Sequence, residues 1–189
     1  ELIDRERADL AVLQSLDKEI ERQKKNVAAD ALSNLASPGV VGGAMIILGE
    51  DYGEGASVIQ ERSYAYAMKS SMWLLDPRPD LPTIVRMVEE GFELSEASHA
   101  PVMLELRIRA CHVTGSFRTR ANRAPAISRR QVMANPDFDY GRICLPPATY
   151  VQEKHKIDVR WPAAVKFLTD HRINEVFDGD ASDVGLILQ

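Results

Sequence analysis

The residues best suited to chemistry lie in one acidic loop that follows a short apolar run. Five apolar residues occupy 44–48, and the next seven, Gly49-Glu-Asp-Tyr-Gly-Glu-Gly55, include three acids and three glycines. Glycine lets a backbone approach a ligand closely, whereas three carboxylates repel a bare phosphate. The loop therefore suits a cation, an amine, a hydroxyl group or the arginine of a partner.

Other common kinds of site find no support in the sequence. The two cysteines, Cys111 and Cys144, form no CxxC pair and indicate free thiols. The four histidines lack metal-ligand spacing, and there is no Ser/His/Asp arrangement, P-loop or GxGxxG. Asp178, Asp180 and Asp183 resemble part of a calcium loop without its required glycine, so we interpret them as turn residues. No metal site is therefore expected in this chain.

An α/β fold is expected to position the acidic loop. The run 44–48 is bounded by turn residues and predicts a central strand that is buried on both faces. Helical patterns flank it, which places the loop 49–57 at the carboxyl end of a parallel strand, where open α/β sheets bind ligands. Right-handed crossovers then give a parallel sheet with helices on both faces. Further helices are predicted at residues 4–25, 27–36 and 60–70, and further strands at 71–75 and 101–109.

The clearest predicted helix begins after Asp80, which can cap it, and has Pro82 in its first turn. Gly91 lies inside this helix and costs about 1 kcal/mol relative to alanine. A close contact between helix and sheet would require such a glycine. The buried stripe of the helix is predicted to consist of Leu81, Ile84, Val85, Val88 and Phe92.

Composition changes at Thr114, which marks a boundary. Six arginines and several prolines between 114 and 147 indicate a surface connector. Because the chain as a whole is acidic, binding of another subunit or domain is favoured over binding of phosphates. A helix is predicted at 148–171, with Pro162 kinking or restarting it. The predicted parts are a partial α/β domain at 1–113, the connector and helix at 114–183, and the first strand of a second domain at 184–189.

Overall composition restricts the class of protein. The chain has 189 residues, of which 45% are hydrophobic and 27% are charged, as in ordinary globular domains. The net charge of −5 argues against nucleic acid as the main partner. No apolar run approaches the ~20 residues of a membrane span, and the charged start does not resemble a signal peptide. We therefore expect a cytoplasmic protein without a membrane partner, and the abrupt ends indicate part of something longer.

Several short segments, taken in order, carry a family resemblance. They are Asn26-Val-Ala-Ala-Asp30, Gly39-Val-Val-Gly-Gly43, the loop Asp51…Gly53…Ser57, Phe92-Glu-Leu-Ser-Glu96 with Pro101-Val, Arg109-Ala-Cys-His112, Lys154-His155, Ile173-Asn174 and Val184-Gly-Leu-Ile-Leu-Gln189. Together they resemble the first domain and connector of the large subunit of indolepyruvate:ferredoxin oxidoreductases. The resemblance covers residues 26 to 189.

This resemblance implies the pyrimidine-binding fold of thiamine diphosphate enzymes. It also implies oxidative decarboxylation of aryl 2-oxoacids, such as indolepyruvate, to acyl-CoA with ferredoxin as the electron acceptor. Thiamine diphosphate, magnesium and iron–sulfur clusters would be the cofactors, held largely by other domains or subunits of the same enzyme. A homo-oligomer is also expected.

The chain departs from the family pattern in three ways. No segment before Asn26 resembles the helix that carries the glutamate activating the pyrimidine ring. The GDG…N diphosphate motif is absent, and so are the cluster cysteines. The catalytic residues therefore stay unknown, and we expect this chain alone to bind none of these cofactors and to be inert.

Five residues are carried over as positions near a domain interface or a cofactor pocket: Asp51, Gly53, Ser57, Arg109 and His112. A purely structural interpretation of the same residues is that Asp51 and Ser57 cap the following helix and that His112 satisfies a strand end.

Two other functions remain open. One is a non-catalytic assembly module, indicated by Val58-Ile59 where the family has polar residues. The other is an unrelated α/β domain that binds a small polar ligand through the acidic loop.

Overall fold

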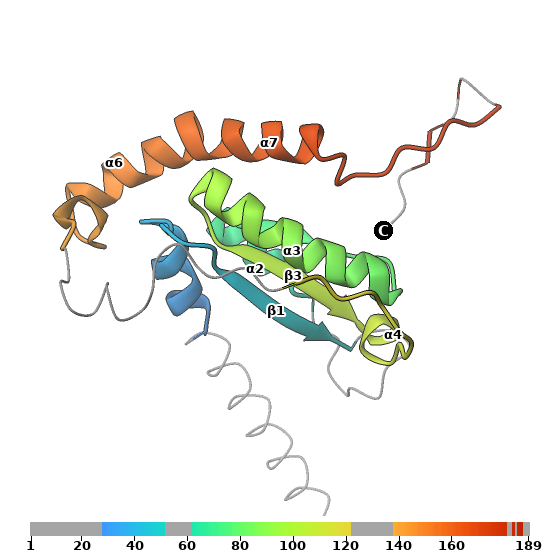
Figure 1. The fold of residues 1–189 in the computed structure, drawn as a ribbon. Coiled ribbons are helices and arrows are strands. Elements are labelled where there is room, and N and C mark those ends of the chain that lie inside the picture. The colour runs from blue at the N-terminus through green and yellow to red at the C-terminus, as the bar shows by residue number, and fades with distance from the viewer. Residues whose placement is uncertain (1–27, 52–61, 122–137, 181–182, 184, 187–189) are drawn as a thin grey trace, which may run out of the picture.

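The computed structural model describes residues 28–51, 62–121, 138–180, 183 and 185–186. Its centre is a three-stranded parallel sheet with helices on both faces (Figure 1). The strands are β1 (Met45–Glu50), β2 (Trp73–Leu75) and β3 (Val102–Arg107). The α/β fold class with a parallel sheet is therefore confirmed, and the architecture is consistent with a pyrimidine-binding type of fold.

The middle strand of this sheet is β3. It pairs with β1 from Met45 opposite Val102 to Glu50 opposite Arg107, and β2 pairs along its other side. The prediction that the run 44–48 is the central strand, buried on both faces, is wrong, because β1 is an edge of the described sheet and Ile47 is 60% exposed. An apolar run reports a tendency to be buried, but strand order decides which run lies in the middle.

Alternate side chains of β3 enter two separate cores. Val102 and Leu104 lie under α3 (Leu81–Ser98) and α7 (Trp161–Asp170). Met103 points the other way and packs with Ala36 of the helix at residues 28–36 and with Ala67 of α2 (Tyr64–Ser70). This two-sided burial follows from the alternation of side chains along a strand, and it leaves no face of β3 for water at these three positions.

Helix α3 begins where the sequence predicts. The side chain of Asp80 accepts a hydrogen bond of 2.9 Å from the Thr83 amide, and Pro82 lies in the first turn. The predicted buried stripe is shifted, however, and Phe92 is 44% exposed. The residues that α3 buries are Met87, Gly91, Leu94, Ser95 and Ser98. Small side chains on this face let the helix lie close to the sheet.

Gly91 explains how close that approach is. A Cβ atom at this position would lie 2.5 Å from Met45 Cε, 3.2 Å from Leu75 Cδ1 and 3.7 Å from Val102 Cγ1. These neighbours come from all three strands. The prediction that a close contact between helix and sheet accounts for this glycine is confirmed.

Two buried serines of α3 connect the helix to the strands beneath it. Ser95 Oγ accepts a hydrogen bond of 3.0 Å from the Ala44 amide and donates one of 2.7 Å to the Ala100 carbonyl. Ser98 Oγ accepts a hydrogen bond of 2.8 Å from Trp73 Nε1. Such buried hydroxyls fix the position of the helix because a slip would leave polar groups unpaired.

The connector ends in a long helix that lies over α3 (Figure 1). It consists of α6 (Ala148–His155), a π-helical turn η2 (Lys156–Arg160) and α7. Pro162 lies in the first turn of α7, so the predicted restart of the helix there is confirmed. Beyond α7, Ile173 is buried in the core beside Leu168, and the segment 173–180 is irregular.

Two shorter elements complete the described chain. Strand β3 ends at Arg107, two residues before the predicted end, because α4 (Ile108–Cys111) begins immediately. The 3-10 turn η1 (Tyr140–Arg142) precedes α6. The predicted helix at 4–25, most of the acidic loop and much of the arginine-rich segment lie outside the described residues. Of the predicted strand at 184–189, Gly185 and Leu186 are described; both are exposed and irregular.

Candidate functional site

Four charged side chains gather where the three parallel strands end. We call them the carboxyl-edge cluster: Glu50 of β1, Glu105 and Arg107 of β3, and Asp76, which directly follows β2. Glu50 is the register partner of Arg107, and Glu105 precedes Arg107 by two residues, so these side chains share one face of the sheet. Ligands of open α/β sheets bind at this end of the strands.

Arg107 is the centre of the carboxyl-edge cluster. Its Nη2 lies 2.6 Å from Asp76 Oδ2, and its Nε lies 4.0 Å from Glu105 Oε1. The Glu105 side chain is only 3% exposed, so its charge is removed from water. A buried carboxylate is costly unless a cation lies close by, and Arg107 supplies that cation for two acids at once.

Glu50 is the member of the cluster with unused acceptor capacity. The residue is 5% exposed. Its Oε1 accepts a short hydrogen bond from the Ser63 amide, which precedes α2. Its Oε2 is buried and has no hydrogen-bond partner among the described residues. A buried acceptor without a donor costs stability, so an N–H or O–H group supplied from elsewhere would bind there favourably.

Asp76 holds its proton more tightly than an ordinary aspartate. Burial raises the pKa of Asp76 above 3.8, and the charge of Arg107 together with its hydrogen bond partly opposes this effect. The folded state therefore takes up a proton at a higher pH than the unfolded state does. The stability of the wild type relative to Asp76→Asn should increase as the pH falls from above the folded pKa towards 3.8, and then stay constant.

Urea unfolding of both proteins at several pH values between 3.5 and about 7 tests this expectation. Because Asp76→Asn removes one titrating group, the difference between the two curves isolates Asp76 from the other carboxylates. If the variant instead gains stability relative to the wild type as the pH falls, the effect of Arg107 on the pKa of Asp76 outweighs that of burial.

The structure brings three of the five predicted site residues to this edge. Asp51 directly follows β1 and is partly buried. Arg109 lies in α4, and His112 caps the C-terminus of that helix; both are exposed. Helix α4 lies against the end of β1, since a Cβ atom at Gly49 would lie 3.8 Å from Cys111 Sγ. Gly53 and Ser57 fall outside the described residues.

Sequence reasoning missed the carboxyl-edge cluster. Glu50, Asp76, Glu105 and Arg107 were not singled out as a group. The signal that could have found them is the strand Val102-Met-Leu-Glu-Leu-Arg107, in which charges occupy alternate positions of an otherwise apolar run. A charged residue two places after a fully buried one, on the same face, is costly without a partner. That cost predicts a compensating cluster.

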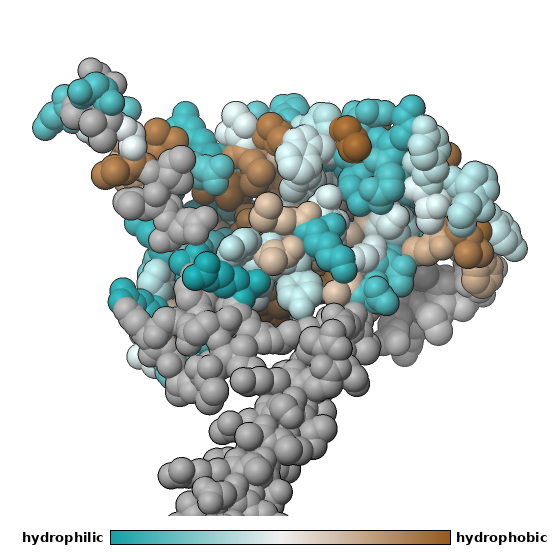
Figure 2. Space-filling view, turned by 180° about the vertical axis from the view of Figure 1, so that it is seen from behind, coloured by the Kyte–Doolittle hydropathy of each residue, from teal (hydrophilic) through white to brown (hydrophobic). Residues whose placement is uncertain are grey.

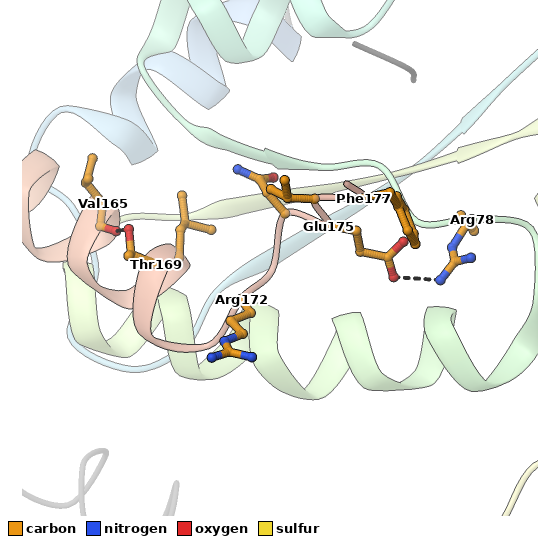
Figure 3. Close-up of a pocket in the computed structure, with 9 residues that line it drawn as sticks. Arg78, Val165, Thr169, Arg172, Glu175 and Phe177 are labelled. Carbon is orange, nitrogen blue, oxygen red and sulfur yellow. Dashed lines mark hydrogen bonds and ion pairs between the residues drawn. The ribbon is translucent and has the colours of Figure 1, made fainter. Parts of the chain in front are cut away.

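A separate pocket of about 890 Å³ lies at the end of α7 (Figure 3). Its lining includes Val165, Leu168 and Phe177, and it is bordered by Arg78, whose Nη2 lies 2.6 Å from Glu175 Oε1. No member of the carboxyl-edge cluster lines this pocket. The two places are therefore distinct.

Neither a metal centre nor a membrane span is found in the part of the chain that the structure describes. No group of three or more His, Cys, Asp or Glu side chains there has an arrangement that would hold a metal ion. No described helix is both long enough and apolar enough to cross a bilayer. The two cysteines, Cys111 and Cys144, are free and exposed.

Fold and site together define a parallel α/β domain with charged residues at the carboxyl edge of its sheet. Comparison with known proteins adds a relationship. The chain is similar to the indolepyruvate oxidoreductase subunit IorA of Methanothermobacter marburgensis, with 25% identity over 163 residues, which are 86% of this chain and 25% of that protein. It is also similar to IorA of Methanothermobacter thermautotrophicus, with 26% identity over 169 residues.

The relationship is distant and partial. The chain spans about a quarter of the length of the curated relatives that it matches, 25% in each case. No protein-family model matches the chain. No solved structure matches it. The relatives are subunits of an oxidoreductase, so the chain is similar to one part of a multi-subunit enzyme.

Proposed function

We propose that this chain is the first domain and connector of a thiamine diphosphate-dependent 2-oxoacid:ferredoxin oxidoreductase, and that it is inert alone. The complete enzyme would decarboxylate aryl 2-oxoacids such as indolepyruvate oxidatively to acyl-CoA. The observation that carries the proposal is similarity to IorA subunits along 86% of the chain. The parallel sheet with ionisable residues at its carboxyl edge supports it, because such an edge is where α/β enzymes bind ligands.

The described residues fit only one part of the proposed cofactors. The carboxyl-edge cluster contains three acids and one arginine, and its net negative charge would repel a diphosphate. Two exposed cysteines do not make an iron–sulfur site. Glu50 Oε2, in contrast, has no hydrogen-bond partner among the described residues and fits an N–H donor such as the amino group of a pyrimidine ring. The diphosphate, magnesium and clusters would then be held by other domains or subunits.

In this proposal the chain's own residues bind and orient. Glu50 would accept a hydrogen bond from the ring, and Arg107 would hold the neighbouring carboxylates in place. Asp51, Arg109 and His112 would lie near a cofactor pocket or a domain interface, as would Gly53 and Ser57. The boundary near residue 114 would separate this α/β part from the connector.

The first test is a comparison of the isolated chain with the complex that contains it. Calorimetry with thiamine diphosphate and Mg²⁺ should show that the chain alone does not bind the cofactor with a Kd lower than about 1 mM. The complex purified through a tag on this chain should oxidise indolepyruvate in the presence of coenzyme A and a ferredoxin. Tight Mg²⁺-dependent binding by the isolated chain would contradict the proposal.

Glu50→Gln in the complex tests the assigned contact. This variant keeps the shape of the side chain, and it should weaken thiamine diphosphate binding by about tenfold through loss of a charge-assisted hydrogen bond. Glu96→Gln, an exposed glutamate of α3, is the matched control and should have no effect. Equal affinity in wild type and Glu50→Gln would remove Glu50 from the cofactor site.

One observation favours an assembly module as the second candidate. Large apolar side chains along α6, η2 and α7, including Tyr150, Ile157 and Trp161, are more than half exposed. A protein whose role is to hold subunits together needs an exposed apolar surface but does not need catalytic activity. A complex that assembles through this chain and turns over no 2-oxoacid would support this second candidate.

A further inference from the structure

The described sheet has two edges, and only one of them is protected against further pairing. Natural edge strands are commonly short, or carry lysine, proline or a bulge, because a free edge pairs readily with another strand. Strand β2 has three residues and runs directly into Asp76-Pro-Arg-Pro79. Strand β1 lacks all of these features, since Met45-Ile-Ile-Leu-Gly49 contains no charge and no proline and its register with β3 is unbroken. In Figure 1, no described strand lies beyond β1.

The backbone of β1 offers donors and acceptors on this open side. The Val102 amide donates a hydrogen bond of 3.0 Å to the Ala44 carbonyl, so the backbone of Ala44 points towards β3. Because this direction alternates along a strand, the groups that point outward belong to Met45, Ile47 and Gly49. These outward groups have no hydrogen-bond partner among the described residues. One N–H and one C=O at every second residue match the backbone of another extended strand.

The apolar side of helix α3 overhangs the same edge. Phe92 lies at this flank, because a Cβ atom at Gly43, just before β1, would be 2.9 Å from Phe92 Cδ1. Val85 precedes Phe92 by seven residues, which places it on the same flank two turns earlier. Phe92 is 44% exposed and Val85 is half-buried, while Ile47, two residues after the core-facing Met45, is 60% exposed. The apolar side of α3 is therefore wider than the described sheet, and a strand beside β1 would fill the remaining width.

Other exposed apolar side chains have no strand edge beside them. Brown side chains gather in Figure 2 where the segment after α7 meets the body, at the pocket lined by Leu168 and Phe177. No residue of β1, β2 or β3 lines that pocket. At the edge of β1, in contrast, the backbone geometry itself specifies the form of the partner, which is an extended strand.

Another part of the enzyme can supply this strand more easily than a second copy of the chain can. A second copy paired through its own β1 would bring another segment 114–121 to the same face of the sheet. That segment already runs along α3, from Gly115 beside Leu81 to Arg120, whose Nη1 lies 2.9 Å from Glu89 Oε2. The similarity to IorA subunits covers 25% of their length, so about three quarters of those proteins has no counterpart in this chain.

We propose that the outer edge of β1 receives one β-strand from outside this chain. The strand is an extended segment of the complete enzyme, with apolar side chains at alternate positions that pack against Ile47 and Phe92. Its source rests on the proposed function, in which this chain acts only with other domains or subunits. The open edge itself does not depend on any cofactor.

Hydrogen exchange at single residues of β1 tests the proposal. In the isolated chain, the amide of Ile47 should exchange freely, whereas the amides of Ile46 and Leu48, which face β3, should be protected. In the complex purified through a tag on this chain, exchange at Ile47 should slow by at least about a hundredfold. Slow exchange at Ile47 in the isolated chain would mean that the chain covers its own edge, and it would overturn the proposal. Free exchange at Ile47 in the complex would overturn it as well.

Substitutions at Ile47 test whether pairing at this edge holds the complex together. Ile47→Pro removes the outward N–H without breaking a bond to β3, and edge strands tolerate proline at such positions. The variant should keep the circular dichroism spectrum of the wild type, but the yield of complex should fall by at least about tenfold. Ile47→Lys keeps the N–H and places a charge at the edge, so it should also lower the yield. Ile47→Val is the matched control and should not. Full yield of complex from folded Ile47→Pro or Ile47→Lys would overturn the proposal.

A cross-link identifies the partner strand. With Cys111→Ser and Cys144→Ser as background, Ile47→Cys that carries a photoactivatable maleimide should label an apolar segment of the complex outside this chain. Labelling of a second copy, or of this chain's own residues, would overturn the proposal. A protected Ile47 amide in a complex that turns over no 2-oxoacid would refute the proposed function and support the strand pairing, so the two failures can be told apart.

Discussion

Replacing Arg160 by methionine should lower the free energy of unfolding by about 3 kcal/mol. Arg160 lies in η2 and is 3% exposed. Its Nη1 donates a hydrogen bond of 2.9 Å to the Ser37 carbonyl, and its Nη2 donates one of 2.8 Å to the Pro38 carbonyl. Nη2 also donates to Gln152 Oε1. Without the guanidinium, the two carbonyls at the end of the helix 28–36 lose their donor.

The charge of Arg160 is balanced by an unusual partner. Burial lowers the pKa of Arg160, the nearby charge of Arg142 lowers it further, and Glu153 partly opposes both. The acceptors of the guanidinium are free carbonyls at a helix C-terminus, where the helix dipole places partial negative charge. Because arginine stays charged in proteins, the guanidinium of Arg160 stabilises the C-terminal end of the helix 28–36, and this stabilisation requires a cation at that position.

Urea unfolding of Arg160→Met and Arg160→Lys measures this effect. Lysine keeps the charge but has one ammonium group, which cannot reach both carbonyls and Gln152 together, so we expect an intermediate loss. Arg118→Met, on an exposed irregular segment, is the control and should change stability by less than about 0.5 kcal/mol. Equal stability of wild type and Arg160→Met would show that water replaces the guanidinium without cost.

Gly39→Ala should destabilise the chain by at least about 2 kcal/mol. Gly39 has a φ angle of +70°, which alanine adopts only with strain. A Cβ atom there would also collide with the His99 carbonyl oxygen and would lie 2.7 Å from Arg160 Cζ. That carbonyl already accepts a hydrogen bond of 3.0 Å from the Val40 amide, so it cannot move away freely.

Gly42→Ala provides the matched control for this prediction. A Cβ atom at Gly42 would have no heavy atom within 4 Å, and its φ angle is not positive. We expect a change of less than about 0.5 kcal/mol, or a slight gain from a less flexible unfolded chain. Because Gly39 and Arg160 are in contact, the double variant Gly39→Ala/Arg160→Met should lose less stability than the two single variants together. Similar losses for Gly39→Ala and Gly42→Ala would contradict the assigned clash.

Local signals in the sequence were sufficient to predict most of the described strands and long helices, although not α4 or η1. The cap at Asp80, Pro82 in the first turn of α3 and the restart of the helix at Pro162 depend on neighbouring residues only. Strand order depends on pairing between distant segments, which an apolar run does not report. Ile47 was therefore expected inside and lies outside, and the same limit explains the shifted stripe of α3, where contact with the sheet selects Leu94 over Phe92.

The candidate site divides along the same line. Asp51, Arg109 and His112 were predicted from strand ends and motif order, which are visible in the sequence, and the fold places all three at the carboxyl edge. The grouping of buried Glu50 and Glu105 with Arg107 was missed because these residues come from two strands far apart in the chain. What joins them is the register of β1 against β3.

The strand order has a consequence for how this protein is made. Both β1 and β2 pair only with β3 in the described sheet, so β1 and β2, which are consecutive in the chain, are not neighbours. During synthesis, neither of the first two strands has a partner until residues 102–107 have left the ribosome. Over that interval the apolar residues of β1 and β2 depend on the nascent helices, or on a chaperone, for cover.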